Sequence, residues 1–206
     1  MNNLEKSYKR WFDLTILISS HLFPPFWPIW ILLWTLIPLA IKLEDGGSIF
    51  FRQRRIGKNG REFTVTKFRT MIEDAQEKGP AWTLDDDNRV TNVGKFIRKR
   101  SLDELPQTFS IWKGDMSFVG PRALSVKEHS FIEKTIPGFN QRLKIRPGLT
   151  GLAQVYNTDD ESEAKLKYDL EYINSMSPLL DLKLLLLSVT GGLFGKWDRR
   201  GKKSDG

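Results

Sequence analysis

LTILISSHLFPPFWPIWILLWTLIPLAI, residues 14–41, is the stretch that decides the fold of this chain. It contains no Asp, Glu, Lys or Arg, and its one ionisable side chain is His21. About 20 apolar residues are enough for a helix to cross the hydrocarbon core of a bilayer. No small-residue cleavage site follows the stretch, which argues against a secretory signal peptide. The sequence therefore predicts a membrane-inserted segment.

Three prolines, Pro24, Pro25 and Pro28, interrupt this segment. Each lacks an N–H donor and disfavours helix for the residue before it, so a sharp bend is expected. Inside lipid the carbonyls freed by a bend need donors, for which Ser19, Ser20 and His21 are candidates. Trp27, Trp30 and Trp34 share one helical face, which fits either the membrane–water interface or ordinary packing.

Basic residues lie on both sides of the segment, and the positive-inside rule places both flanks on the cytoplasmic side. They are Lys6, Lys9 and Arg10 before it, and Lys42, Arg52, Arg54 and Arg55 after it. We therefore predict a re-entrant helix-break-helix over residues 1–45, broken at Pro24 and Pro25, that enters and leaves by one face. A single span is the alternative.

The composition limits the chemistry. The 206 residues include no cysteine and only two histidines, which excludes disulfides, thiol catalysis and Cys-based zinc sites and makes a His-rich metal site unexpected. The formal net charge of +7 points to an anionic partner, which could be nucleic acid, an anionic membrane or a phosphorylated small molecule.

Beyond residue 45 the patterns indicate an α+β, mostly helical fold. Asn59-Gly60 between two β-prone runs, 49–53 and 63–68, predicts a small β-hairpin. Several short and amphipathic helices follow, expected at 93–99, 105–113, from the capping-box pattern at Thr158 to about 176, and at 179–194. The last is either an interfacial amphipathic helix or a core helix. Residues 46–195 would form the catalytic domain, and residues 196–206 a basic, disordered tail.

The segment Ser101-Leu-Asp-Glu-Leu-Pro-Gln107 admits two interpretations. Ser101 and Glu104 have capping-box spacing, and acidic side chains in a first turn complement the helix dipole. Alternatively, Asp103 and Glu104 both reach past a helix N-terminus towards one bound phosphate group, where one carboxylate attacks phosphorus and the other holds a divalent cation.

Taken together, five segments resemble the monotopic bacterial phosphoglycosyl transferases, the initiating sugar transferases that act on undecaprenyl phosphate. They occur in order and at the expected separations: Lys67-Phe-Arg-Thr-Met71, Ser101-Leu-Asp-Glu-Leu-Pro-Gln107, Lys113-Gly-Asp-Met-Ser-Phe-Val-Gly-Pro-Arg122, Arg146-Pro-Gly-Leu-Thr-Gly-Leu-Ala-Gln-Val155 and Tyr168-Asp-Leu-Glu-Tyr172.

The resemblance implies a two-step reaction at the cytoplasmic face of the bacterial inner membrane, with helices around the active site. Asp103 would attack the sugar-bearing phosphate of a UDP-sugar and release UMP, and polyprenyl phosphate would then accept the phosphosugar. Mg²⁺ would bridge the diphosphate, with Glu104 as its protein ligand. The resemblance also implies phosphate or structural roles for Lys67, Arg98 and Arg122, and a supporting role for Asp169. Three further residues are candidates for binding the substrate, and a structural role is equally plausible for each: Arg69, Arg146 and Gln154.

The chain departs from the family pattern at three places. It has Phe23-Pro24-Pro25 where a Ser-Pro pair is usual, Ala123 where a proline is usual, and Ser110 where Asn is expected. Two other functions stay open: a non-catalytic, basic, membrane-anchored binding module, and a Mg²⁺-dependent hydrolase of nucleotide sugars. No nucleic-acid-reading motif is present, and nothing in the sequence identifies the sugar.

Overall fold

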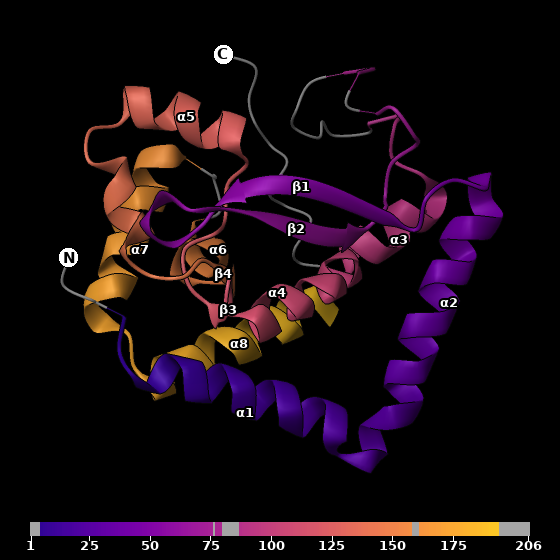
Figure 1. Ribbon diagram of the computed structural model, residues 1–206, viewed down its shortest axis with the longest axis horizontal. Helices are drawn as coiled ribbons and strands as arrows, with labels where there is room; N and C mark the ends of the chain where they lie inside the picture. Colours follow the sequence, from indigo (N-terminus) through magenta and orange to yellow (C-terminus); the bar gives the residue numbers. More distant parts are fainter. Residues whose placement is uncertain (1–4, 76, 80–86, 158–160, 194–206) are drawn as a thin grey trace.

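Two helices that meet at a sharp corner form the N-terminal part of the computed structural model, which describes residues 5–75, 77–79, 87–157 and 161–193 (Figure 1). They are α1 (Tyr8–Leu22) and α2 (Trp27–Asp45), and the short 3₁₀ turn η1 (Pro24–Phe26) lies between them. Both helices run from the corner back to the rest of the protein (Figure 1). The predicted helix-break-helix is therefore present, and its break falls at Pro24 and Pro25.

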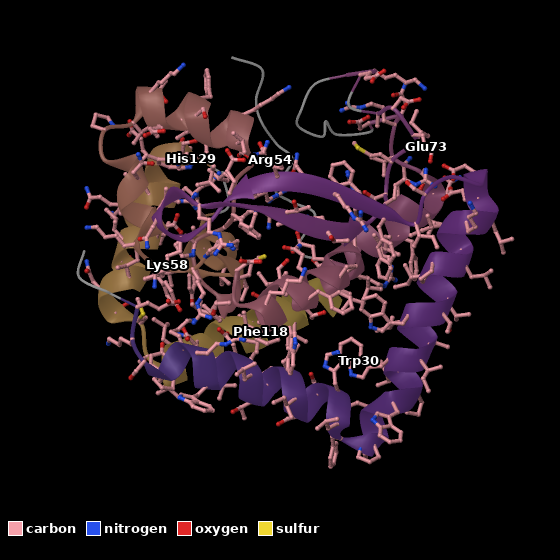
Figure 2. The ribbon with its side chains drawn as sticks, viewed as in Figure 1. Trp30, Arg54, Lys58, Glu73, Phe118 and His129 are labelled. Carbon is pink, nitrogen blue, oxygen red and sulfur yellow. The ribbon has the colours of Figure 1, made fainter. Side chains whose placement is uncertain are left out.

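Two tryptophans supply the hydrogen bonds that the prolines remove. In a helix each N–H donates to the carbonyl four residues earlier, so Pro24 and Pro25 leave the carbonyls of Ser20 and His21 without donors. The indole N–H of Trp30 donates to the Ser20 carbonyl over 2.6 Å, and that of Trp27 donates to the His21 carbonyl over 2.9 Å. Trp30 points from α2 into the angle between the helices (Figure 2). The donors are thus these indoles and not the nearby serine and histidine side chains.

Most of α2 faces away from the protein. The 22 residues Pro24–Asp45 are long and apolar enough to cross a membrane, and only 11% of their most apolar window is buried. The packed side of α2 carries Ile37 and Ile41, which form a small core with Phe68 and Ile97. Trp34 lies against Phe68 and so contributes to ordinary packing.

The predicted hairpin is confirmed. Strands β1 (Phe50–Ile56) and β2 (Glu62–Phe68) pair antiparallel, with Phe51 opposite Lys67 and Arg55 opposite Phe63. Within the turn η2 (Lys58–Gly60), Asn59 and Gly60 both have positive φ, 57° and 78°, as the twist of a tight hairpin requires.

A second small sheet was not predicted. Strands β3 (Ser117–Val119) and β4 (Gly148–Thr150) pair in parallel at the centre of the main core. A Cβ added at Gly148 would lie 2.1 Å from the Gly120 nitrogen, so these backbones approach too closely for any side chain. The core around this sheet includes Ile111, Met116, Val119, Ile145, Tyr172 and Leu184.

Helices surround the two sheets (Figure 1). Those after the hairpin are α3 (Asn92–Lys99), η3 (Leu102–Gln107), α4 (Thr108–Lys113), α5 (Val126–Thr135), η4 (Phe139–Lys144), α6 (Leu152–Tyr156), α7 (Ser162–Ser175) and α8 (Pro178–Leu193). The capping residue expected at Thr158 and the tail predicted for residues 196–206 lie outside the described residues.

Helix α8 combines a core face with an exposed apolar face. Asp181 and Leu184 are fully buried, whereas the other side carries exposed Leu179, Leu182, Leu186, Leu187 and Val189. Lys9, which the sequence placed in the basic flank, is buried beneath this helix. Its ammonium lies 2.8 Å from Asp181 and donates to the Val119 carbonyl and the Tyr172 hydroxyl. Lys9 therefore anchors α1 to the core and presents no charge at the surface.

Candidate active site

The acidic pair Asp103–Glu104 lies in η3, a 3₁₀ turn and not the first turn of an α-helix. Ser101 has a left-handed conformation, with φ of 55°, and its hydroxyl makes no capping hydrogen bond. The capping-box interpretation is therefore wrong, and the α-helix expected at 105–113 begins only at Thr108. Both carboxylates are about nine-tenths buried, so the turn directs two adjacent acids into the protein.

Two segments place a cation in an ion pair with these acids. Lys67, at the end of β2, donates to Glu104 Oε1 over 2.6 Å, and its ammonium is 3.9 Å from Asp103 Oδ2. Arg122, in the loop after β3, donates to the same Glu104 oxygen over 3.2 Å. One carboxylate is thus clasped by two cations, while its neighbour makes a single, longer ion pair.

The two carboxyl groups consequently differ in acidity. Burial raises the pKa of Asp103, and the nearby charge of Lys67 offsets that rise only in part. Burial opposes ionisation of Glu104 too, but Lys67 and Arg122 outweigh it and hold the pKa of Glu104 well below its usual range. Two groups in one site with pKa values pushed in opposite directions are typical of catalytic acid pairs.

Arg98 reaches the pair from α3. Its Nε donates to Thr70 Oγ1 over 2.7 Å, and its charge lowers the pKa of Asp103. Helix α3 lies so close to the segment after β2 that a Cβ at Gly94 would be 2.1 Å from the Thr70 carbonyl oxygen. The Lys67-Phe-Arg-Thr-Met71 segment therefore contributes both Lys67 and the hydroxyl that orients Arg98.

Other candidates are engaged elsewhere. Arg69 forms an ion pair with Asp45 at the end of α2, in which Nη1 lies 2.6 Å from Oδ2. Arg146 pairs with Glu5, with Nε 2.7 Å from Oε1. Each guanidinium ties an N-terminal segment to the main body, which is the ion-pairing alternative that the sequence left open.

Asp169 and Gln154 are both buried. Asp169 is buried and accepts from Arg142 over 2.7 Å, and Arg142 in turn donates to the Arg122 carbonyl over 2.9 Å. Asp169 is thus connected through Arg142 to the backbone that carries Arg122. Gln154 is buried on α6, with its amide against Gly151.

The donor set suits a magnesium ion that the substrate helps to hold. Within the described ranges, no group of three or more His, Cys, Asp or Glu side chains comes together. Mg²⁺ is commonly bound by one or two carboxylates together with substrate phosphates and water. Glu104, the ligand expected from the sequence, meets that requirement only when phosphate groups and water supply further oxygens.

Arg55 and Gln53 also reach this region, and sequence reasoning missed them because Arg55 was read as part of a basic flank. The alternation of side chains along each strand, counted from the Asn59-Gly60 turn, could have identified both residues. Side chains alternate along a strand, so Gln53, Arg55 and Lys67 lie on one face of the hairpin.

Comparisons with known proteins identify the family of this chain. A family model described as bacterial sugar transferase matches residues 4–195. A Klebsiella pneumoniae protein named UDP-glucose:undecaprenyl-phosphate glucose-1-phosphate transferase is 38% identical over 95% of this chain and 42% of its own length. An Aeromonas hydrophila protein named UDP-N-acetylgalactosamine-undecaprenyl-phosphate N-acetylgalactosaminephosphotransferase is 38% identical over 91% and 44%.

Another relative, the exopolysaccharide production protein ExoY of Sinorhizobium fredii, is 39% identical over 88% of this chain and 83% of its own length. The chain spans less than half the length of the first two relatives. The family match nevertheless covers every described residue, including both acids and the cations around them. The chain belongs to the bacterial sugar transferase family.

Proposed function

We propose that this protein is a phosphoglycosyl transferase that moves a sugar-1-phosphate from a UDP-sugar to undecaprenyl phosphate and releases UMP. The observation that carries the proposal is the buried Asp103–Glu104 pair, with one acid clasped by two cations and the other less compensated. The names of the relatives support the donor and the acceptor. Such a reaction is a first membrane step in the assembly of a bacterial polysaccharide or other glycoconjugate.

Asp103 is the proposed nucleophile. Its raised pKa indicates a carboxylate that burial leaves poorly stabilised and therefore more basic than an exposed aspartate. A bond forms between its oxygen and the sugar-bearing phosphorus, and the bond from that phosphorus to the UMP oxygen breaks. An oxygen of the lipid phosphate then attacks the same phosphorus and releases Asp103. Two covalent steps allow two large anionic substrates to use one site in turn.

The remaining charged groups neutralise phosphate. A phosphoryl transition state needs mainly positioning and positive charge, which Lys67, Arg98 and Arg122 supply from three segments. Glu104, with Asp103 beside it, would hold Mg²⁺ against the diphosphate. When bound, this ion would supply further positive charge to the diphosphate. Lys67 lowers the pKa of Glu104 and so keeps it ionised, as a metal ligand must be.

We place the active site at the cytoplasmic face of the inner membrane, with the corner between α1 and α2 in the bilayer as a re-entrant segment. Both helices return to the same body, whereas a single span would separate its flanks (Figure 1). The hydrogen bonds from Trp27 and Trp30 supply donors at the corner that lipid could not provide. The exposed apolar face of α8 would lie at the membrane surface beside it.

The test is UMP release by the full chain in lipid nanodiscs, with Mg²⁺, undecaprenyl phosphate and a panel of UDP-sugars. Wild-type protein should release UMP from at least one donor, and continued turnover should require the lipid phosphate. Asp103→Asn should abolish release. Glu171→Gln removes an exposed carboxylate on α7 and should retain activity. Turnover that ignores the lipid acceptor would establish a hydrolase instead. A fully active Asp103→Asn protein would refute the assigned nucleophile.

A further inference from the structure

Arg55 lies on the face of the hairpin that meets the acidic pair. Strand β1 places Phe51 opposite Lys67, and Arg55 is four residues further along, so Arg55 and Lys67 project from the same face. Its neighbour Arg54 projects from the opposite face, where its side chain is 74% exposed and pairs with Glu62. In Figure 2 Arg54 lies on the outer side of the hairpin. Two adjacent arginines therefore occupy opposite environments.

The Arg55 guanidinium is held rigidly beside the loop that carries Arg122. Its Nη1 donates to the carbonyl of Ala123, and its Nε and Nη2 both donate to Gln53 Oε1, over 3.2 and 2.9 Å. The backbone of β1 is also attached to this loop, since the Ile56 N–H donates to the Leu124 carbonyl over 3.0 Å. The orientation of Arg55 is therefore set before any ligand binds.

Among the described residues, the hydrogen-bond acceptors of Arg55 are all neutral. In the part of the chain that the structure describes, no carboxylate lies within 4.0 Å of its guanidinium. Burial and the neighbouring charge of Arg122 lower the pKa of Arg55 to about 10, so it remains a cation at neutral pH. Lys67, Arg122 and Arg55 all act on the charge of Glu104. Four cations, which include Arg98, thus gather around the two buried acids Asp103 and Glu104. Glu128 adds one further negative charge near Arg55 and Arg122, so positive charge still exceeds negative charge and a further anion would be stabilised.

We infer that Arg55 is a substrate-binding residue that contacts the diphosphate of the nucleotide donor, with Gln53 as the residue that positions it. This inference rests on the proposed function, since it concerns the same site. A guanidinium whose donors are pre-oriented binds phosphate at little entropic cost. The arginine has a purely structural alternative, in which it only attaches the hairpin to the loop at Ala123.

Binding of UDP and of UMP to the full chain in nanodiscs, with Mg²⁺, separates the two roles. UDP retains a diphosphate and UMP does not. We expect Arg55→Met to weaken UDP binding by ~10-fold or more, because a hydrogen bond to a charged group is worth about 1.4 kcal/mol or more. UMP affinity should change much less. Arg54→Met removes the adjacent arginine from the outer face and should bind both nucleotides as wild type does.

A structural role would reduce thermal stability and lower both affinities together, leaving the UDP-to-UMP ratio unchanged, and that result would overturn the inference. If Arg55→Met does not fold, Arg55→Lys keeps the charge but loses the fork of donors, and Gln53→Leu leaves Arg55 unsupported. Both variants should lower the affinity for UDP relative to that for UMP. An unchanged ratio of the two affinities in both variants would again overturn the inference. Wild-type protein that neither binds UDP nor releases UMP from any donor would instead refute the proposed function.

Discussion

Replacing each acid of the pair by its amide should change stability in opposite directions. Glu104→Gln removes the charge from an oxygen that accepts from Lys67 over 2.6 Å and from Arg122 over 3.2 Å. Hydrogen bonds to charged groups contribute about 1.5–3 kcal/mol each, and the amide oxygen retains part of both. Breaking a buried pair from one side costs roughly 3–5 kcal/mol, so we expect a loss of about 3 kcal/mol.

For a chain of this size ~1 kcal/mol corresponds to roughly 2–4 °C, so the melting temperature should fall by about 6–12 °C. Asp103→Asn should instead leave stability unchanged or raise it. An acid whose pKa is raised by folding stabilises the protein only at low pH, and this stability is lost as the pH rises through the folded-state pKa. Above its folded-state pKa, the ionised Asp103 therefore lowers the stability of the folded protein, and the neutral amide removes this effect.

Glu104 has the reverse dependence, because folding lowers its pKa. Its contribution is present above the unfolded pKa of about 4.3 and is lost as the pH falls below it. Thermal unfolding of the three proteins in nanodiscs, followed by tryptophan fluorescence at pH 7 and at about pH 3.5, below the unfolded pKa of glutamate, measures both effects. Equal losses of stability in the two variants would refute the asymmetry of the pair. A Glu104→Gln protein as stable as wild type would show that Lys67 and Arg122 do not clasp this residue.

Two further perturbations test the site and the corner. Lys67→Met should shift the acid limb of the kcat/KM profile to higher pH, because the lysine charge lowers the pKa of Asp103, and an unshifted limb would contradict this coupling. Trp30→Phe should lower stability by about 1–2 kcal/mol, since it leaves the Ser20 carbonyl without its indole donor. Trp11→Phe, at a side chain 74% exposed, is the matched control, and equal melting temperatures for both variants would contradict the role of the indole.

The sequence by itself determined the elements whose cause is local. Pro24 and Pro25 break the apolar helix because each lacks an N–H, and Asn59-Gly60 closes the hairpin because both residues accept a positive φ. The same locality explains an error. Capping-box spacing at Ser101 predicts an α-helix start, but the left-handed backbone there forms a 3₁₀ turn that directs both acids inward.

Only the tertiary structure decided which charged residues form ion pairs with one another. Arg69 and Asp45 are 24 residues apart, Arg146 and Glu5 are 141 apart, and Lys9 and Asp181 are 172 apart. A sequence records that a residue is charged, but burial and long-range pairing set whether it binds a ligand or anchors the fold. Lys9 accordingly became an internal anchor, and Arg55 came to face the acidic pair. The strength of an ion pair depends on distance and desolvation, and packing alone establishes both.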